Sequence, residues 1–246
     1  MISNLRVLTW NLFHGRSLPP AGRSLREDFA ALLAGWEWDV ALLQEVPPWW
    51  SAALAARAGA QERTVLTSRN WLAPLQRALA ERLPDVMKSW GGGANAILSR
   101  RGIDEHRRTT LRRWPERRVA HAVRIADGTW AVNLHATAHR PARAAADLRQ
   151  ARAAALEWSR GAPLVLGGDL NLRDPEVAGL VHAARGKVDH VFSRGWEPAG
   201  DSESLPRGRL SDHAPVAVDL RRPGAAAGSG ARGPGRNGTR RRREAV

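Results

Sequence analysis

Short apolar runs alternate with helix-like segments along most of the chain, and this alternation limits the fold more than any other feature. Strand-like runs are predicted over residues 5–10, 39–44, 63–68, 94–99, 119–125, 129–135, 164–168, 188–192 and 214–220. Helix-like segments are predicted over residues 23–35, 47–58, 70–82, 141–158 and 175–185. Strands and helices interleaved in this way indicate one α/β domain.

Turn and capping residues support two of these boundaries. Asp127 and Gly128 form a hairpin signal directly before the strand at 129–135. Asp174 is a favourable N-cap and Pro175 a favourable first helical residue, so the two together predict the helix at 175–185.

Composition divides the chain into a body and a tail. The 246 residues are 43% hydrophobic, which is enough for a substantial core. Residues 221–246 hold eight arginines and one glutamate, which is half of the net charge of +14. This segment has too little apolar surface for burial to offset the entropy lost on ordering. We therefore predict a folded domain over 1–220 and a disordered Arg/Gly-rich basic tail over 221–246.

Location and partners follow from charge and hydropathy. No apolar run approaches the roughly 18 residues of a membrane span. The N-terminal residues lack a basic segment and a long apolar stretch, so we expect a cytoplasmic monomer without a membrane partner. The basic body favours a polyanionic partner such as nucleic acid. Because the chain has no cysteine, disulfides are excluded and any metal must bind to oxygen or imidazole ligands.

Polar side chains stand where several predicted strands end. In an α/β domain, loops at one edge of the sheet gather such groups into a ligand site. The residues at these positions are Asn11, Glu45, His135, Asp169, Asn171, Asp212 and His213.

These residue types suit the hydrolysis of a phosphate ester. Mg²⁺ prefers carboxylate and amide oxygens, which Glu45, Asn11 and Asp212 supply. Attack on phosphorus needs a base for the water, and Asp169 or His213 can serve. Asn171 and His135 can donate hydrogen bonds to the phosphoryl oxygens.

The motifs that carry these residues resemble, in number and order, those of a known superfamily. The segments TWN, QE, NLHAT, GDLN, DHVF and SDH, read along the chain, resemble the endonuclease/exonuclease/phosphatase superfamily. The resemblance spans about residues 5–220. It implies the deoxyribonuclease I-like fold: a four-layer α/β (α+β) sandwich of two packed mixed β-sheets flanked by helices. It also implies phosphoester hydrolysis dependent on Mg²⁺ or Mn²⁺, with 1–220 as the catalytic domain.

The resemblance also implies a role for each matched residue. Five of them are catalytic: His135 as the phosphate-binding or general-acid histidine, Asp169 and Asn171 as the pair that orients water and contacts phosphate, His213 as a general base, and Asp189 as the carboxylate that orients His213. On the metal side it implies Asn11 and Glu45, with Asp212 as a further carboxylate. Whether Asp169 or His213 takes the proton stays open.

The residues that contact substrate are less clearly marked. Asn95 follows a glycine-rich stretch and matches a family strand, and Arg118 enters a strand from the Arg-rich segment 100–118. We take both as candidate substrate-binding residues, with a solvated loop as the alternative for 100–118. His14, just past TWN, is expected on a surface loop, with a position facing the cleft as the alternative.

Departures from the motifs of individual subfamilies reduce the range of possible substrates. Abasic-site endonucleases have a tyrosine in the site and a second acid two residues after the TWN asparagine, whereas this chain has no tyrosine and Phe13 at that position. The signature of inositol polyphosphate phosphatases is absent, and bacterial sphingomyelinases are secreted. We therefore expect a metal-dependent phosphodiester hydrolase, a nuclease acting on DNA or RNA in endo or exo mode. The alternatives are a phosphatase for a small phosphorylated metabolite or lipid headgroup, and a catalytically silent nucleic-acid-binding protein.

Overall fold

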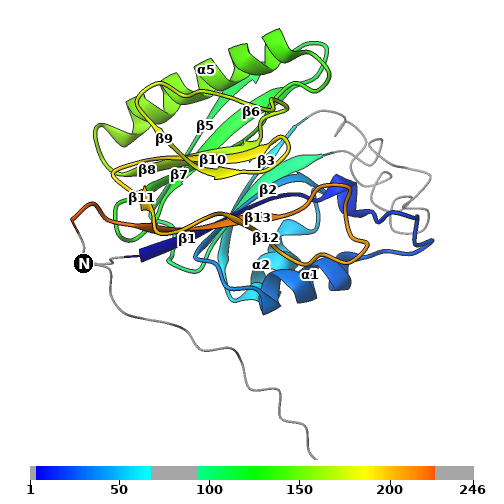
Figure 1. Ribbon diagram of the computed structural model, residues 1–246. Coiled ribbons are helices and arrows are strands. Elements are labelled where there is room, and N and C mark those ends of the chain that lie inside the picture. Colours follow the sequence, from blue (N-terminus) through cyan, green and yellow to red (C-terminus); the bar gives the residue numbers. More distant parts are fainter. Residues whose placement is uncertain (1–3, 68–92, 225–246) are drawn as a thin grey trace, which may run out of the picture.

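Two mixed β-sheets pack face to face in the computed structural model, which describes residues 4–67 and 93–224 (Figure 1). Sheet 1 has the order β11 (Glu197–Pro198), β13 (Val216–Arg221), β1 (Asn4–Asn11), β2 (Val40–Val46), β4 (Ala94–Ser99) and β3 (Gln61–Leu66), with β12 (Glu203–Ser204) also paired to β13. Sheet 2 has the order β5 (Glu105–Arg112), β6 (Arg118–Arg124), β7 (Trp130–His135), β8 (Leu164–Asp169), β10 (Asp189–Arg194) and β9 (Val181–Arg185). Parallel pairs, β1 with β2 and β7 with β8, lie at the centre of each sheet.

Helices cover the outer face of each sheet. Figure 1 shows α5 (Pro141–Ser159) over sheet 2 at the top, and α1 (Arg26–Gly35) and α2 (Ser51–Ala58) below sheet 1. A short 3-10 helix, η1 (Phe13–Gly15), follows β1. The predicted four-layer sandwich of the deoxyribonuclease I-like type is therefore confirmed. None of the helices within the described ranges is long and apolar enough to cross a membrane.

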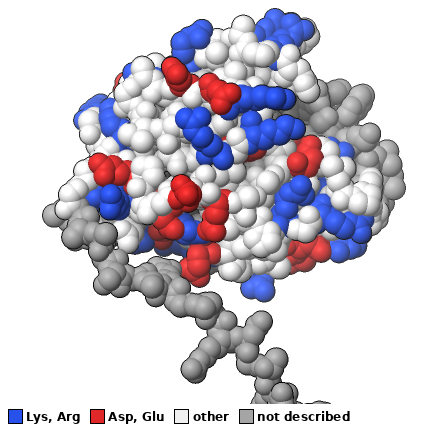
Figure 2. Space-filling model, viewed as in Figure 1, with Lys and Arg blue, Asp and Glu red and all other residues white. Residues whose placement is uncertain are grey.

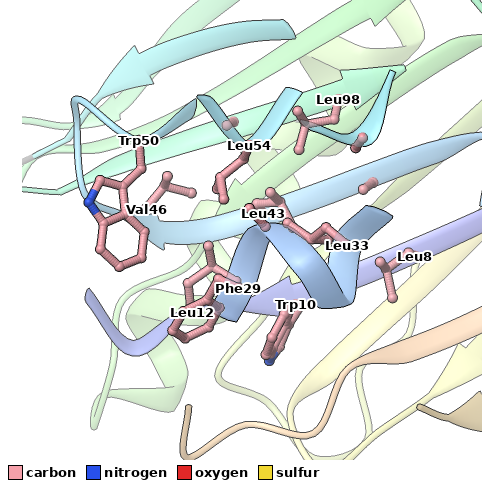
Figure 3. Close-up of a cluster of buried hydrophobic side chains, with 14 of the residues drawn as sticks. Leu8, Trp10, Leu12, Phe29, Leu33, Leu43, Val46, Trp50, Leu54 and Leu98 are labelled. Carbon is pink, nitrogen blue, oxygen red and sulfur yellow. The ribbon is translucent and has the colours of Figure 1, made fainter. Parts of the chain in front are cut away.

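Three hydrophobic clusters hold the four layers together. The first lies between sheet 1 and helices α1 and α2, where Trp10, Phe29 and Leu43 pack together (Figure 3). The second fills the space between the sheets, and Leu42 belongs to it. Leu42 and Leu43 point to opposite faces because side chains alternate along a strand. Central strands buried on both faces explain why the sequence shows continuous apolar runs rather than alternation.

The third cluster lies between sheet 2 and α5. Leu148 and Ala151 of the helix pack there against Leu166 of β8 and Phe192 of β10. Burial of these side chains fixes α5 across sheet 2, and this placement brings the start of the helix close to the end of β7.

The predicted helix at 175–185 is wrong. Residues 181–185 instead form β9, which pairs with β10 along the edge of sheet 2. Gly179 adopts a positive φ of 78° just before the strand, and a glycine costs a helix interior about 1 kcal/mol. Pairing with the open edge of β10 therefore determines the structure of residues 181–185, although the local capping residues favour a helix.

Besides β9, three strands within the described ranges are missing from the sequence prediction: β5 and the two-residue strands β11 and β12. Residues 105–112 of the Arg-rich segment form β5, which pairs with β6 at the other edge of sheet 2. The remaining predicted strands and helices within the described ranges are present, with ends shifted by up to four residues. The predicted helix at 70–82 and the tail from 225 onward lie outside the described residues, and the domain boundary at 220 stays a prediction.

Candidate active site

Three neighbouring strands of sheet 2 place their polar ends side by side. His135 at the end of β7 pairs in register with Asp169 at the end of β8. Asp169 in turn pairs with Asp189 at the start of β10. The register of one sheet therefore brings together three predicted catalytic residues that are far apart in the sequence.

The two glycines before Asp169 allow these strands to approach closely. A Cβ on Gly168 would lie 1.9 Å from the main-chain oxygen of Leu134 on β7, and Gly168 has a φ of 138°. A Cβ on Gly167 would lie 2.7 Å from the main-chain oxygen of His190 on β10. Only glycine fits at these positions, so the GGD sequence serves the close packing that aligns Asp169 with its neighbours.

Sheet 1 supplies the facing half of the site. The side-chain amide of Asn11, at the end of β1, donates a hydrogen bond of 2.9 Å to Oδ2 of Asp169 across the two sheets. The Ser211 hydroxyl donates to the main-chain oxygen of Asn11 at 2.7 Å and accepts from the main-chain N–H of His213 at 3.0 Å. Ser211 thus holds the loop with His213 against β1, a role that its sequence position does not reveal.

His213 and Asp189 form a hydrogen-bonded pair. Nδ1 of His213 lies 2.8 Å from Oδ2 of Asp189, and Nε2 lies 3.8 Å from Oδ2 of Asp169. Burial lowers the pKa of His213, but the hydrogen bond and charge of Asp189, together with the charge of Asp169, outweigh it and raise the pKa to about 9. The predicted role of Asp189 in orienting His213 agrees with this contact.

Asp169 lies at the centre of the site and is almost fully buried. Burial and the nearby charge of Asp189 raise the pKa of Asp169 to about 7, against the opposing effects of His213 and Asn11. Its Oδ1 accepts a hydrogen bond of 3.0 Å from the main-chain N–H of Asn171, which has a φ of 50°. The Asn171 side chain donates to the main-chain oxygen of Ala136, so this residue closes the turn after β8.

His135 faces the same carboxylate from the other side. Its Nε2 lies 3.4 Å from Oδ2 of Asp169 and 3.9 Å from Oε1 of Glu45. Burial, followed by the charge of Arg118, lowers the pKa of His135 well below its usual value. A neutral imidazole here can give or accept one hydrogen bond without carrying charge.

Glu45 occupies an unusual backbone position at the end of β2. Its φ is 50°, in the left-handed region, and the pairing of β2 with β4 shifts between Leu43 and Val46. Such strain costs about 1–3 kcal/mol and is often found at functional sites. Oε2 of Glu45 lies 3.1 Å from Nε2 of His14, which also lines the cavity described below, so His14 takes the alternative position that faces the cleft and not the expected surface loop.

Two further predicted residues lie at the margin of this centre or outside it. Asp212 is exposed, and its Oδ1 is 4.0 Å from Nε2 of His213. Asn95 is buried on β4, where its amide donates to the main-chain oxygen of Val119 on β6 at 3.3 Å, and it is not among the residues that line the cavity described next.

A cavity of about 500 Å³ opens beside Glu45 and His135. Five arginines and two glutamates line it among the described residues: Arg112, Arg117, Arg118, Arg140, Arg143, Glu45 and Glu116. Because arginines outnumber glutamates there, the lining of the cavity is suited to a negatively charged ligand. Elsewhere on the surface, basic and acidic side chains are intermixed, as the face shown in Figure 2 illustrates.

Comparison with known proteins identifies the family. The family model described as Endonuclease/Exonuclease/phosphatase family matches residues 8–213. The chain belongs to the endonuclease/exonuclease/phosphatase family. A search of curated proteins found no match.

Solved structures agree with this family at the level of the fold. An endonuclease/exonuclease/phosphatase from Beutenbergia cavernae DSM 12333 is 20% identical, with a TM-score of 0.64 over 90% of this chain and 72% of that chain. A truncated TDP2 from Caenorhabditis elegans is 16% identical, with a TM-score of 0.63 over 89% of this chain and 98% of that chain. An endonuclease/exonuclease/phosphatase from Bacteroides vulgatus is 14% identical, with a TM-score of 0.67 over 90% of this chain and 100% of that chain. Membership of the family, shown by the match over residues 8–213, makes the chain a hydrolase of phosphoester bonds.

Members of the endonuclease/exonuclease/phosphatase family generally depend on a divalent metal, and two groups of side chains here could hold one. Possible ligand atoms of Asp169, Asp189 and His213 lie within 4.8 Å of one another, and Oδ1 of Asp189 is buried without a hydrogen-bond partner among the described residues. Glu45 and Asn11, the pair that the family resemblance predicts, are the second group: Glu45 offers a carboxylate on the cavity wall, and Asn11 an amide oxygen that also accepts from the main-chain N–H of Phe13. Both groups consist largely of the hard oxygen donors that Mg²⁺ and Mn²⁺ prefer.

Proposed function

We propose that this hydrolase is a divalent-metal-dependent nuclease that cleaves phosphodiester bonds of DNA or RNA by attack of water on phosphorus. The observation that supports this most is the meeting of Asp169, His135 and the Asp189–His213 pair beside an arginine-lined cavity. Proton-transfer groups and a basic surface for phosphates then lie at the same edge of the sandwich.

Asp169 and His213 would manage the proton of the attacking water. Asp189 fixes the imidazole of His213 so that Nε2 faces Asp169, and the amide of Asn11 fixes the carboxylate of Asp169. Either group is proposed to take the proton, because Oδ2 of Asp169 and Nε2 of His213 lie 3.8 Å apart and can face the same water. His213 would do so in its neutral form, which its raised pKa of about 9 makes the minor form at neutral pH.

His135 would stabilise the phosphoryl group. Its Nε2 faces Asp169 and Glu45, and its low pKa keeps the ring neutral at physiological pH, so it would act as a hydrogen-bond donor to a phosphoryl oxygen. Asn171 and Arg118 are proposed to contact substrate phosphate as well.

Glu45 and Asn11, with Asp212 as a further carboxylate, would hold the metal. This assignment leaves the Asp189–His213 pair for proton transfer. A bound Mg²⁺ or Mn²⁺ would supply Lewis-acid polarisation of the phosphoryl oxygen.

A small phosphoester is the second candidate substrate. The cavity of about 500 Å³ falls within the range of pockets that bind small molecules. A phosphorylated metabolite could place one phosphate near His135 and a second anionic group among the arginines.

The test uses two substrates and two histidine variants. Purified protein with Mg²⁺ or Mn²⁺ is expected to nick supercoiled plasmid and to cleave bis-p-nitrophenyl phosphate. Both activities should disappear with EDTA and in His213→Ala, but not in His106→Ala, a control on β5 outside the cavity lining. Cleavage of the small ester without any cleavage of DNA or RNA would favour the second candidate. No metal-dependent cleavage of either would refute the proposal.

A further inference from the structure

The tip of the β5–β6 hairpin combines an exposed aromatic ring with the basic cavity. Residues 113–117 connect β5 to β6, and Pro115, Glu116, Arg117 and Arg118 line the cavity in succession. We propose that this tip binds a nucleotide of single-stranded nucleic acid, with Trp114 stacking on the base and the arginines of the cavity holding the adjoining phosphates. This inference rests on the proposed nuclease function and names the substrate form.

Trp114 is exposed in a way that no packing role explains. Its exposed fraction is 82%, the largest among the exposed large hydrophobic residues that the structure describes. By contrast, Trp10, Trp38 and Trp196 are each at most 2% exposed. A base that stacks on an exposed indole removes apolar surface of both partners from water, and such stacking tolerates any base because every base has a π-face.

Arg118, next to this tip, has unmet hydrogen-bonding capacity. The residue is 6% exposed, and its guanidinium lies 2.6 Å from Oε2 of Glu116. Its buried Nε has no hydrogen-bond partner among the described residues, and neither has Nε of Arg112. A buried N–H without a partner costs free energy, so a phosphate oxygen entering the cavity would satisfy donors that are already in place.

Contacts within the chain hold these arginines in position. Arg112 pairs with Arg118 across the hairpin ladder, directly beneath the tip. The guanidinium of Arg112 also lies 3.1 Å from Oδ1 of Asp147, a fully buried carboxylate on α5. Arg140 and Arg143, at the start of the same helix, also line the cavity. Arg112 and Arg118 are therefore ordered before any ligand arrives, which reduces the entropy cost of binding.

The surroundings of the tip favour a nucleic acid over a lipid surface. Trp114 is a single aromatic residue next to the exposed Arg113, whereas insertion into a membrane interface requires a larger continuous apolar face. The cavity also contains Glu45 and His135, so a ligand there lies directly beside the proposed reaction centre. A polymer of phosphodiesters would occupy both places with successive nucleotides.

Single-stranded rather than duplex nucleic acid fits a stacking site. Bases in a duplex are already stacked on their neighbours, and a protein ring reaches them only after unstacking, which costs a few kcal/mol per step. An unpaired strand presents free base faces and a flexible backbone that can enter a cavity of this size.

The experiment measures binding in the absence of divalent metal, so that it does not depend on hydrolysis. Fluorescence anisotropy with labelled oligo(dT) of twelve nucleotides in EDTA compares the wild type with Trp114→Ala, Trp114→Phe and Val181→Ala. Val181 is 50% exposed on β9 and serves as the control for loss of an exposed apolar side chain. Loss of stacking should raise the Kd of Trp114→Ala roughly 5-fold to 150-fold, with partial rescue in Trp114→Phe and no change in Val181→Ala.

A second probe separates stacking from charge. An oligomer of the same length that carries abasic sites throughout has the phosphates but no bases. We expect the wild type and Trp114→Ala to bind it equally. Arg143→Gln should weaken binding of both probes and lower the slope of log K against log salt concentration by about 0.7.

Three results would overturn the inference. One is a Kd of Trp114→Ala for oligo(dT) within twofold of the wild type, and another is an equal loss of affinity for the abasic probe. The third is binding of the wild type, but not of Trp114→Ala, to phosphatidylcholine–phosphatidylserine vesicles with no binding to oligo(dT). Because cleavage of bis-p-nitrophenyl phosphate by the wild type tests the reaction separately, the inference can fail while the proposed hydrolysis stands.

Discussion

Asp147 should carry much of the stability of the cavity wall, and Asp147→Asn tests this. The carboxylate is fully buried on α5. It accepts hydrogen bonds from the main-chain N–H of Thr137 at 3.0 Å and from the Thr137 hydroxyl, and its other oxygen faces Arg112 at 3.1 Å. An asparagine has one acceptor and one donor in this space, so its NH₂ group would face either Arg112 or the N–H of Thr137, both of which are donors.

The cost follows from these contacts. A hydrogen bond to a charged group is worth about 1.5–3 kcal/mol, and breaking a fully buried ion pair costs about 3–5 kcal/mol. The Arg112 side chain is 23% exposed, so water can partly replace its lost partner and the lower part of this range applies. We expect Asp147→Asn to reduce the free energy of unfolding by about 3 kcal/mol, which lowers the Tm of a domain of this size by roughly 6–12 °C.

Thermal unfolding followed by circular dichroism measures this effect. The control is Asp174→Asn, because the Asp174 side chain is 90% exposed and lies 3.9 Å from Arg185. An exposed pair of this kind contributes little, so its Tm should stay within about 1 °C of the wild type. If Asp147→Asn melted within the same margin as the control, the view that this buried carboxylate anchors Arg112 and the end of β7 would be refuted.

Further predictions concern the backbone, pH and metal. Gly168→Ala should unfold the domain or abolish activity, since its Cβ would lie 1.9 Å from a main-chain oxygen of β7; a Tm equal to that of Gly22→Ala, where open space surrounds the Cβ, would contradict this. Burial, followed by the charge of Arg185, lowers the pKa of His182 to about 4 in the folded protein. Because the unfolded chain binds this proton more readily, the contribution of His182 to the free energy of unfolding should be complete above pH 6.5 and should be lost as the pH falls to 4. Urea unfolding at several pH values should show that the free energy of unfolding falls less steeply with decreasing pH in His182→Gln than in the wild type. An equally steep fall in both proteins would exclude this histidine as a cause. Calorimetric titration with Mn²⁺ should show at least tenfold weaker binding in Glu45→Gln; loss of binding in Asp189→Asn instead would place the metal in the Asp/Asp/His group.

The layers and most of the site could be predicted from the sequence because both depend on local patterns. Apolar runs with polar residues at their ends define central strands, and the pairing of such strands brings their ends together. His135 and Asp169 illustrate this, since they are neighbours in a parallel pair whose register follows from burial of both strands. Resemblance to the family then assigned roles that spacing alone left open.

Residues whose role depends on distant contacts could not be predicted in this way. Asp147 lies within an Ala/Arg-rich helix where an acidic residue usually faces solvent, and only the packing of α5 on sheet 2 buries it against Thr137. Residues 181–185 form a strand because β10 has an open edge, which no local signal near Pro175 reveals. Strand β5 is polar because it is an edge strand, although Thr109 and Thr110 gave a weak signal for it.

The position of the site at the junction of the sheets makes its geometry a property of the whole sandwich. Sheet 2 contributes Asp169, sheet 1 contributes Asn11, and the hydrogen bond between them crosses from one layer to the other. Deeper between the sheets, the Gln44 amide on β2 donates to Oδ1 of Asn133 on β7 at 2.8 Å, and the Asn133 amide donates to main-chain oxygens of sheet 1. Buried polar contacts of this kind are satisfied in only one relative placement of the two sheets, whereas apolar packing alone tolerates small shifts. The polar pairs between the layers therefore fix the distance between the two halves of the candidate site. The proposed catalytic residues depend in this way on Gln44 and Asn133, which do not line the cavity.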